Sequence, residues 1–242
     1  MLELTGLHKT YGKSVKAVDD LDLTVNKGEI FGFIGPNGAG KTTTIKMITG
    51  IINPDSGSIK VNGISLNADP LGAKQQIGFV PDTPSMFLRL KGIEYLNFMG
   101  DMYSVSTADR QARIEHLAKE FDLTRVLADP IQSYSHGMRQ KIIVIGVLLH
   151  QPPVWIMDEP MTGLDPRSSF TLKQMMREHA DLGNTVFFST HVLEVAEKLC
   201  TRVAIINKGR ILFCGGMESM REHFRTHASL ENIFLELTSD AE

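Results

Sequence analysis

The sequence predicts an α/β fold, and three observations carry that prediction. The apolar run at residues 30–34 leads into a glycine-rich loop and then into a helical pattern. Two further apolar runs, residues 154–157 and 185–189, are each followed by polar side chains. Buried parallel strands are typically continuous apolar runs, and ligands bind at their carboxyl ends. The 242 residues are enough for one large domain, or for one domain with a subdomain.

Residues 2–7 and 15–25 alternate weakly and precede the first core strand, which predicts a small antiparallel sheet beside the core. Tyr11 lies in a Tyr-Gly turn between them. Its ring either packs on the protein surface or stacks on an adenine ring, and the local sequence favours the first alternative. Residues 58–61 form a short strand that ends at an Asn-Gly hairpin turn. Residues 77–80 form another, which two prolines stop, so Asp82 lies on a loop at a strand end.

Residues 85–150 have a different pattern. Apolar side chains recur at helical spacing in residues 90–103 and 108–121, and no strand is evident. We therefore expect a helical insert, which closes with the run Tyr-Ser-His-Gly-Met at 134–138 and an apolar helix to Leu149. Ser135 is a good helix N-cap, and Gly137 permits close backbone approach. This helix start is either a simple cap or a second anion site.

The remainder of the chain returns to strand and helix. Helices are predicted at 166–181 and 192–199, a hairpin at 202–213, and short helices at 217–224 and 230–237. We expect one domain in which 1–84 and 151–215 form the core with its β-subdomain. In this division 85–150 is the helical subdomain and 216–242 is a short helical tail.

The glycine-rich loop fits a phosphate-binding pattern of Gly, four residues, and Gly-Lys-Thr. Glycines allow the backbone to approach phosphates, and the N–H groups at a helix start favour negative charge. The Lys side chain reaches the β- and γ-phosphates, and the Thr hydroxyl ligates Mg²⁺. With Thr43, which follows, the predicted nucleotide-binding residues are Gly35, Pro36, Asn37, Gly38, Ala39, Gly40, Lys41 and Thr42.

Two carboxylates, Asp158 and Glu159, end the strand at 154–157. Burying unpaired charge is costly, and a nearby metal ion gives a reason for it. Asp158 fits the residue that holds Mg²⁺ through water, and Glu159 fits the base that orients or polarises the attacking water. His191 follows a third buried strand, where a lone histidine is usually structural. Together these residues predict a Mg²⁺-dependent site that binds phosphates and activates water.

Composition limits the alternatives. The net charge of −3 gives no reason to expect nucleic-acid binding. The two cysteines, Cys200 and Cys214, have neither disulfide-framework nor metal-ligand spacing, so we expect buried structural thiols. The longest apolar run is far shorter than the roughly 20 residues that span a bilayer. Any membrane-spanning part would therefore belong to another chain.

From Tyr11 to His191 the motifs resemble, in order, those of the ATPase subunit of ATP-binding-cassette (ABC) transporters. The loop at 35–42 resembles the Walker A motif, and Asp158 with Glu159 resembles Walker B and its catalytic glutamate. The resemblance implies that Tyr11 stacks on adenine, that His191 is the switch histidine, and that Asp165 belongs to the D-loop. Residues 134–138 lie where the family carries Leu-Ser-Gly-Gly-Gln.

The resemblance also implies a fold and a mechanism. The fold would be that of a phosphate-loop NTPase, with a RecA-like core, an antiparallel subdomain and a helical subdomain. Two subunits would close head to tail around two ATPs, and Ser135 and Gly137 of one would bind the γ-phosphate held by the other. Three positions depart from the family: Asp82 replaces the usual Gln as a Mg²⁺ ligand, and His136 and Met138 replace Gly and Gln of the signature.

The implied partners are a second ATPase subunit, either the same chain or a paralogue, and integral membrane permease subunits. The ending at 229–238 and the altered signature are similar to the bacterial exporter branch with ABC-2-type membrane subunits. The expected location is the cytoplasmic face of the cell membrane, as a peripheral subunit. The alternative is a soluble cassette ATPase that acts on ribosomes or nucleic acid. Such proteins carry two cassettes or a long coiled coil, and this sequence has neither.

Overall fold

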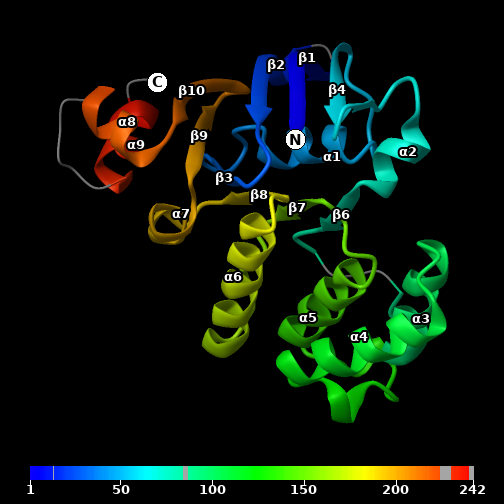
Figure 1. Ribbon diagram of the computed structural model, residues 1–242. Helices are drawn as coiled ribbons and strands as arrows, with labels where there is room; N and C mark the ends of the chain where they lie inside the picture. Colours follow the sequence, from blue (N-terminus) through cyan, green and yellow to red (C-terminus); the bar gives the residue numbers. More distant parts are fainter. Residues whose placement is uncertain (13, 84–86, 224–229, 240–242) are drawn as a thin grey trace.

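The computed structural model describes residues 1–12, 14–83, 87–223 and 230–239. They form two sheets and a group of helices that lies to one side of both (Figure 1). This arrangement confirms the predicted α/β fold.

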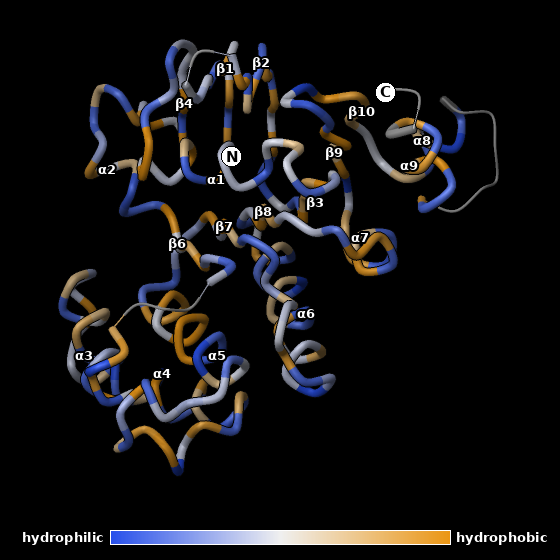
Figure 2. Tube along the Cα trace, turned by 180° about the vertical axis from the view of Figure 1, so that it is seen from behind, coloured by the Kyte–Doolittle hydropathy of each residue, from blue (hydrophilic) through white to orange (hydrophobic). Residues whose placement is uncertain are grey.

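The larger sheet has six strands in the order β10-β9-β3-β8-β7-β6. Its inner pairs are parallel, and only the β9–β10 hairpin is antiparallel. β3, β7 and β8 are buried along their whole length, as expected for strands with both faces covered. The central strands are accordingly hydrophobic in Figure 2. The six strands are β3 Ile30–Ile34, β6 Ile77–Val80, β7 Val154–Asp158, β8 Thr185–Thr190, β9 Arg202–Asn207 and β10 Arg210–Gly215.

The smaller sheet is antiparallel, in the order β2-β1-β4-β5, and confirms the predicted subdomain sheet. Its buried face packs on the core through Leu2 and Leu7, in one cluster with Phe31 of β3. Helix α1, Lys41–Ile48, contributes Ile45 to that cluster. The four strands are β1 Leu2–Tyr11, β2 Val15–Val25, β4 Ser56–Val61 and β5 Ile64–Ser65.

The helical group consists of α3 Gly92–Met102, α4 Thr107–Glu120 and α5 His136–Leu148. No strand occurs between residues 87 and 150, as the sequence predicted. α5 lies between the other two and the sheet and is buried along most of its length. Tyr95 of α3 packs against Gly146 of α5, where a Cβ would lie 2.7 Å from the tyrosine hydroxyl oxygen. Buried apolar side chains of α3, α4 and α5 belong to the same cluster as those of β7 and β8, so the helical group shares a hydrophobic core with the larger sheet.

The other helices are α2 Pro70–Gln75, α6 Pro166–Asp181, α7 Leu193–Leu199, α8 Met217–His223 and α9 Leu230–Ser239. α8 and α9 lie beside β10 and α7 (Figure 1). The sequence did not predict α2, a short helix that Asp69 caps and Pro70 begins. The predicted helix end at Phe224, the proline at 84 and the start of the ending at Ser229 fall outside the described residues.

Two expectations were wrong. Tyr11 is the last residue of β1 and pairs with Val15, so the turn follows it rather than contains it. Cys214 is exposed, because it lies on the edge strand β10 on the side opposite buried Phe213. Within the described residues, none of the helices has the length and apolar character needed to traverse a bilayer.

Candidate functional site

The phosphate loop, residues 35–40, connects the end of β3 to the start of α1. Gly40 precedes the helix at a φ of 109°, and a Cβ there would lie 2.3 Å from the carbonyl oxygen of Ala17. Gly35 has no room for a side chain either, since a Cβ would lie 2.4 Å from the carbonyl oxygen of Ile206. No side chain caps α1, so the N–H groups of its first turn stay available to a bound anion.

Lys41 lies folded back over the loop. Its Nζ donates hydrogen bonds of 2.7 Å to the Gly35 carbonyl and 3.2 Å to the Pro36 carbonyl. Burial lowers the pKa of Lys41, while the nearby carboxylates of Glu159 and Asp158 oppose that shift. The Lys41 ammonium therefore stabilises the loop conformation through these hydrogen bonds, and Lys41 also lines the cavity where phosphates would lie.

Asp158 ends β7 with its side chain 2% exposed. Ser189 of β8 donates a hydrogen bond of 2.5 Å to its Oδ1, and Thr42 of α1 also hydrogen-bonds to it. Burial raises the pKa of Asp158, and these two hydrogen bonds oppose the rise. Asp82 and Glu159 add to it through repulsion between like charges. A cation at this place would relieve that repulsion.

Glu159 has a φ of 49°, in the left-handed region that few residues other than glycine adopt. Its backbone N–H donates a 3.0 Å hydrogen bond to Ser189 Oγ, which holds this conformation in place. Its Oε1 lies 3.0 Å from Nδ1 of His191, whose side chain is 58% exposed. The carboxylate thus contacts an accessible imidazole that follows β8.

These groups surround one cavity of about 230 Å³. The structure therefore brings the phosphate loop, Thr42 and Thr43 together with all three predicted carboxylates, Asp82, Asp158 and Glu159. Tyr11 is not among the lining residues; it stands 44% exposed at the end of β1. His191 reaches the cavity only through Glu159. Sequence reasoning missed Ser189 because a serine within an apolar strand carries no motif.

Ser135, Gly137 and Asp165 lie outside the cavity. Ser135 caps α5 and accepts a 3.3 Å hydrogen bond from the Met138 N–H. Asp165 caps α6, and its Oδ2 lies 2.6 Å from Nζ of Lys141. The Lys141 ammonium holds the pKa of Asp165 well below its usual range, with help from Ser168. The start of α5 and the loop before α6 are thus in contact, but these three residues do not line the cavity at the phosphate loop of their own chain.

The residues fit a nucleoside triphosphate and Mg²⁺. Neighbouring backbone carbonyls leave no space for side chains at Gly35 and Gly40, and no side chain caps the helix start. Oxygen donors of Thr42, Asp158 and Asp82 meet at the cavity. Within the described residues, no three His, Cys, Asp or Glu side chains form a metal site by themselves. The oxygen donors at the cavity suit Mg²⁺, which one or two carboxylates usually hold together with substrate phosphates.

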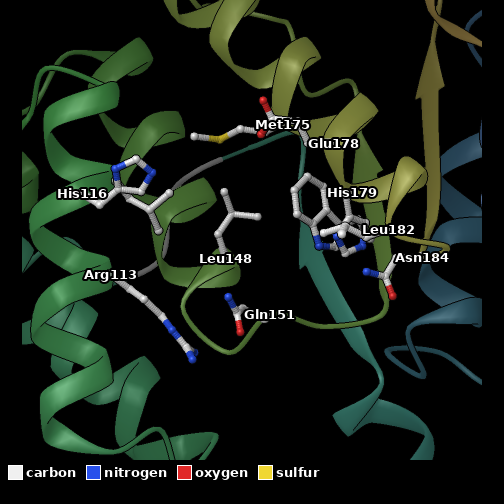
Figure 3. Close-up of a pocket in the computed structure, with 11 residues that line it drawn as sticks. Arg113, His116, Leu148, Gln151, Met175, Glu178, His179, Leu182 and Asn184 are labelled. Atoms are coloured by element: carbon white, nitrogen blue, oxygen red, sulfur yellow. The ribbon is translucent and has the colours of Figure 1, made fainter.

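A second, larger cavity of about 460 Å³ lies between α4 of the helical group and α6 (Figure 3). Arg113 and His116 of α4 line one side, and His179 and Leu182, on and after α6, line the other. Trp155 and His179 stack there with ring centroids 4.0 Å apart. None of the predicted site residues lines this cavity.

Comparison with known proteins agrees with the geometry. The family model described as ABC transporter matches residues 18–162. The linearmycin resistance ATP-binding protein LnrL of Bacillus subtilis (strain 168) is 37% identical over 215 residues, 89% of this chain and 69% of that protein. The ABC transporter ATP-binding protein NatA of the same organism is 36% identical over 225 residues, 92% of this chain and 91% of that protein.

Two further similarities agree with these. The Nod factor export ATP-binding protein I of Ralstonia nicotianae is 33% identical over 223 residues, 92% of this chain and 69% of that protein. A solved structure of an ATP-binding subunit of an ABC transporter has a TM-score of 0.93 at 35% identity and covers 98% of this chain and 99% of its own. The chain therefore belongs to the ABC transporter family, as an ATP-binding subunit that hydrolyses ATP.

Proposed function

We propose that this chain powers an exporter by closing, as one of two ATPase subunits, around two ATP molecules. It would act as a peripheral subunit at the cytoplasmic face of the membrane, on separate integral membrane subunits. The observation that carries the two-subunit proposal is the position of Ser135 and Gly137. They form a capped helix start that does not line the cavity of the chain's own phosphate loop. A second copy or a paralogue would supply the nucleotide that this helix start binds.

Export is favoured by the relatives. LnrL is named for linearmycin resistance, and the Ralstonia protein for Nod factor export. Both are named as ATP-binding proteins, and the match covers 69% of each. We therefore propose that this chain is an export ATPase. The membrane subunits, and not this chain, would bind the cargo.

In the proposed mechanism the phosphate loop binds the triphosphate, and Lys41 leaves the Gly35 carbonyl to hold the β- and γ-phosphates. Thr42 and Asp82 would hold Mg²⁺ through their oxygens and Asp158 would hold it through water, and the bound ion would neutralise phosphate charge. Glu159 accepts a proton from the attacking water. His191, which already contacts Glu159, would orient that carboxylate toward the attacking water and contact the γ-phosphate itself. Tyr11 would stack on the adenine ring from the end of β1.

Co-purification tests this proposal. A tagged Glu159→Gln form would be extracted from membranes in mild detergent with ATP, and the proteins that accompany it identified. An integral membrane partner with several predicted spans would support the exporter proposal. Ribosomal proteins or nucleic acid without a membrane partner would instead support a soluble cassette ATPase and overturn it.

A further inference from the structure

The loop from Glu159 to Asp165 is held at both ends. At its start, the Glu159 N–H donates to Ser189 of the core sheet. At its end, Asp165 forms an ion pair with Lys141 of α5, in the helical group. Two backbone hydrogen bonds inside the loop, Thr162 N–H to the Glu159 carbonyl and Leu164 N–H to the Met161 carbonyl, keep it compact. The segment therefore bridges the core and the helical group.

The ion pair between Lys141 and Asp165 is a short, partly buried link between the helical group and the loop. Lys141 Nζ lies 2.6 Å from Asp165 Oδ2, and the lysine side chain is only 12% exposed. The same carboxylate accepts hydrogen bonds from the Ser168 N–H at 2.9 Å and the Ser168 hydroxyl at 2.8 Å. Charge-assisted hydrogen bonds in a partly buried setting are stronger than exposed ion pairs, which are worth little.

Backbone packing at the start of α5 reinforces this contact. A Cβ on Gly137 would lie 2.5 Å from the Gly163 carbonyl oxygen, so the two chain segments touch directly. A Cβ on Gly163 would lie 2.4 Å from the His136 ring. The first turns of α5 and the loop that begins at Glu159 are therefore in direct contact at two points besides the ion pair.

We infer that Lys141 is a positioning residue for hydrolysis, which acts through Asp165. It ties the helix that begins at Ser135 to the loop that begins at Glu159. Under the proposed function, on which this inference rests, Ser135 meets the nucleotide held by the partner subunit. Nucleotide at one site then places Glu159 at the other, so the two sites hydrolyse ATP cooperatively.

Four variants test the inference. Lys141→Met keeps the aliphatic stem but removes the charge. Asp165→Asn removes the ion pair but keeps a good helix cap, so α6 should still begin at the same place. Lys141→Arg keeps a cation within reach of the carboxylate. Lys198→Met is the matched control, since it breaks an exposed ion pair with Glu194 on the surface of α7.

The measurement is the ATPase rate as a function of ATP concentration, with thermal unfolding of each variant beside it. We expect Lys141→Met and Asp165→Asn each to lower the rate about tenfold, which is the size of coupling expected between contacting residues. We also expect the Hill coefficient to fall to about 1. The double variant should be no worse than either single one. Lys141→Arg and Lys198→Met should behave as the unmodified protein does.

Wild-type rate and cooperativity in a folded Lys141→Met form would overturn the inference, as would additive losses in the double variant. Dimer formation is measured separately, by size-exclusion chromatography of the Glu159→Gln form with ATP. Failure there would remove the two-subunit proposal itself, whatever the result with Lys141. A loss of unfolding temperature alone, with normal cooperativity, would assign Lys141 a purely structural role and also overturn the inference.

Discussion

The hydroxyl of Ser189 donates a 2.5 Å hydrogen bond to Asp158, and the same oxygen accepts a 3.0 Å hydrogen bond from the Glu159 N–H. One side chain on β8 thus fixes both acids at the end of β7. It orients the proposed metal ligand and holds the next residue at a positive φ. This arrangement makes Ser189 a supporting residue for two separate functions of the site.

Ser189→Ala should therefore impair both acids, because each loses its hydrogen bond to the hydroxyl. Without the hydrogen bond, the pKa of buried Asp158 should rise further, because the Ser189 contact opposes the upward shift. We expect the Mg²⁺ concentration for half-maximal ATPase activity to rise about tenfold, since losing a hydrogen bond to a charged group costs about 1.5–3 kcal/mol. Thr49→Ala is a suitable control, because it removes a buried hydroxyl that bonds only to backbone carbonyls of α1. An unchanged Mg²⁺ requirement would contradict this role.

Glu159→Gln should keep ATP binding and slow hydrolysis by about 10² to 10⁴, the range expected when a general base is lost. The amide is nearly isosteric with the carboxylate, and the backbone hydrogen bond to Ser189 does not depend on the side chain. The slowed enzyme should accumulate as a closed dimer with ATP. Single-turnover phosphate release measures the effect. Near-normal hydrolysis would remove Glu159 from the proposed catalytic role.

Lys41→Ala should abolish nucleotide binding or hydrolysis. The variant loses the cation directed at the phosphates and also the two hydrogen bonds that brace the loop through the Gly35 and Pro36 carbonyls. Binding of a fluorescent ATP analogue and steady-state turnover measure the two effects. Lys46→Ala on the same helix is the control, since Lys46 lies in the last turn of α1 rather than at the loop. Normal turnover by Lys41→Ala would refute the phosphate-loop assignment.

The sequence predicted the features that local pattern determines. The strand–loop–helix at residues 30–48, the antiparallel strands at the N-terminus and the helical character of residues 87–150 were all confirmed. It did not predict α2, because six residues that begin at Pro70 carry little helical periodicity. It also missed Ser189 and Lys141, whose partners Asp158 and Asp165 lie 31 and 24 residues away. Contacts of that kind depend on strand register and helix packing, which no local motif encodes.

His179 should make the protein less stable in mild acid. The residue is 8% exposed, its ring stacks on Trp155, and burial lowers its pKa to about 4. The pKa in the unfolded chain is about 6.5, so the unfolded state binds the proton first as pH falls. Stability contributed by the neutral ring is therefore complete above pH 6.5 and is lost progressively as the pH falls toward 4. Thermal unfolding between pH 7.5 and 4.5 measures this loss.

His179→Phe keeps an aromatic ring against Trp155 but does not titrate. Its unfolding temperature should fall less steeply with decreasing pH than that of the unmodified protein. Part of the slope should remain, because burial also lowers the pKa of His150 to about 4. His116→Phe, at an exposed position beside the same cavity, is the matched control and should leave the slope unchanged. If His179→Phe and the unmodified protein lose stability equally between pH 6.5 and 4.5, the buried imidazole does not contribute to acid sensitivity.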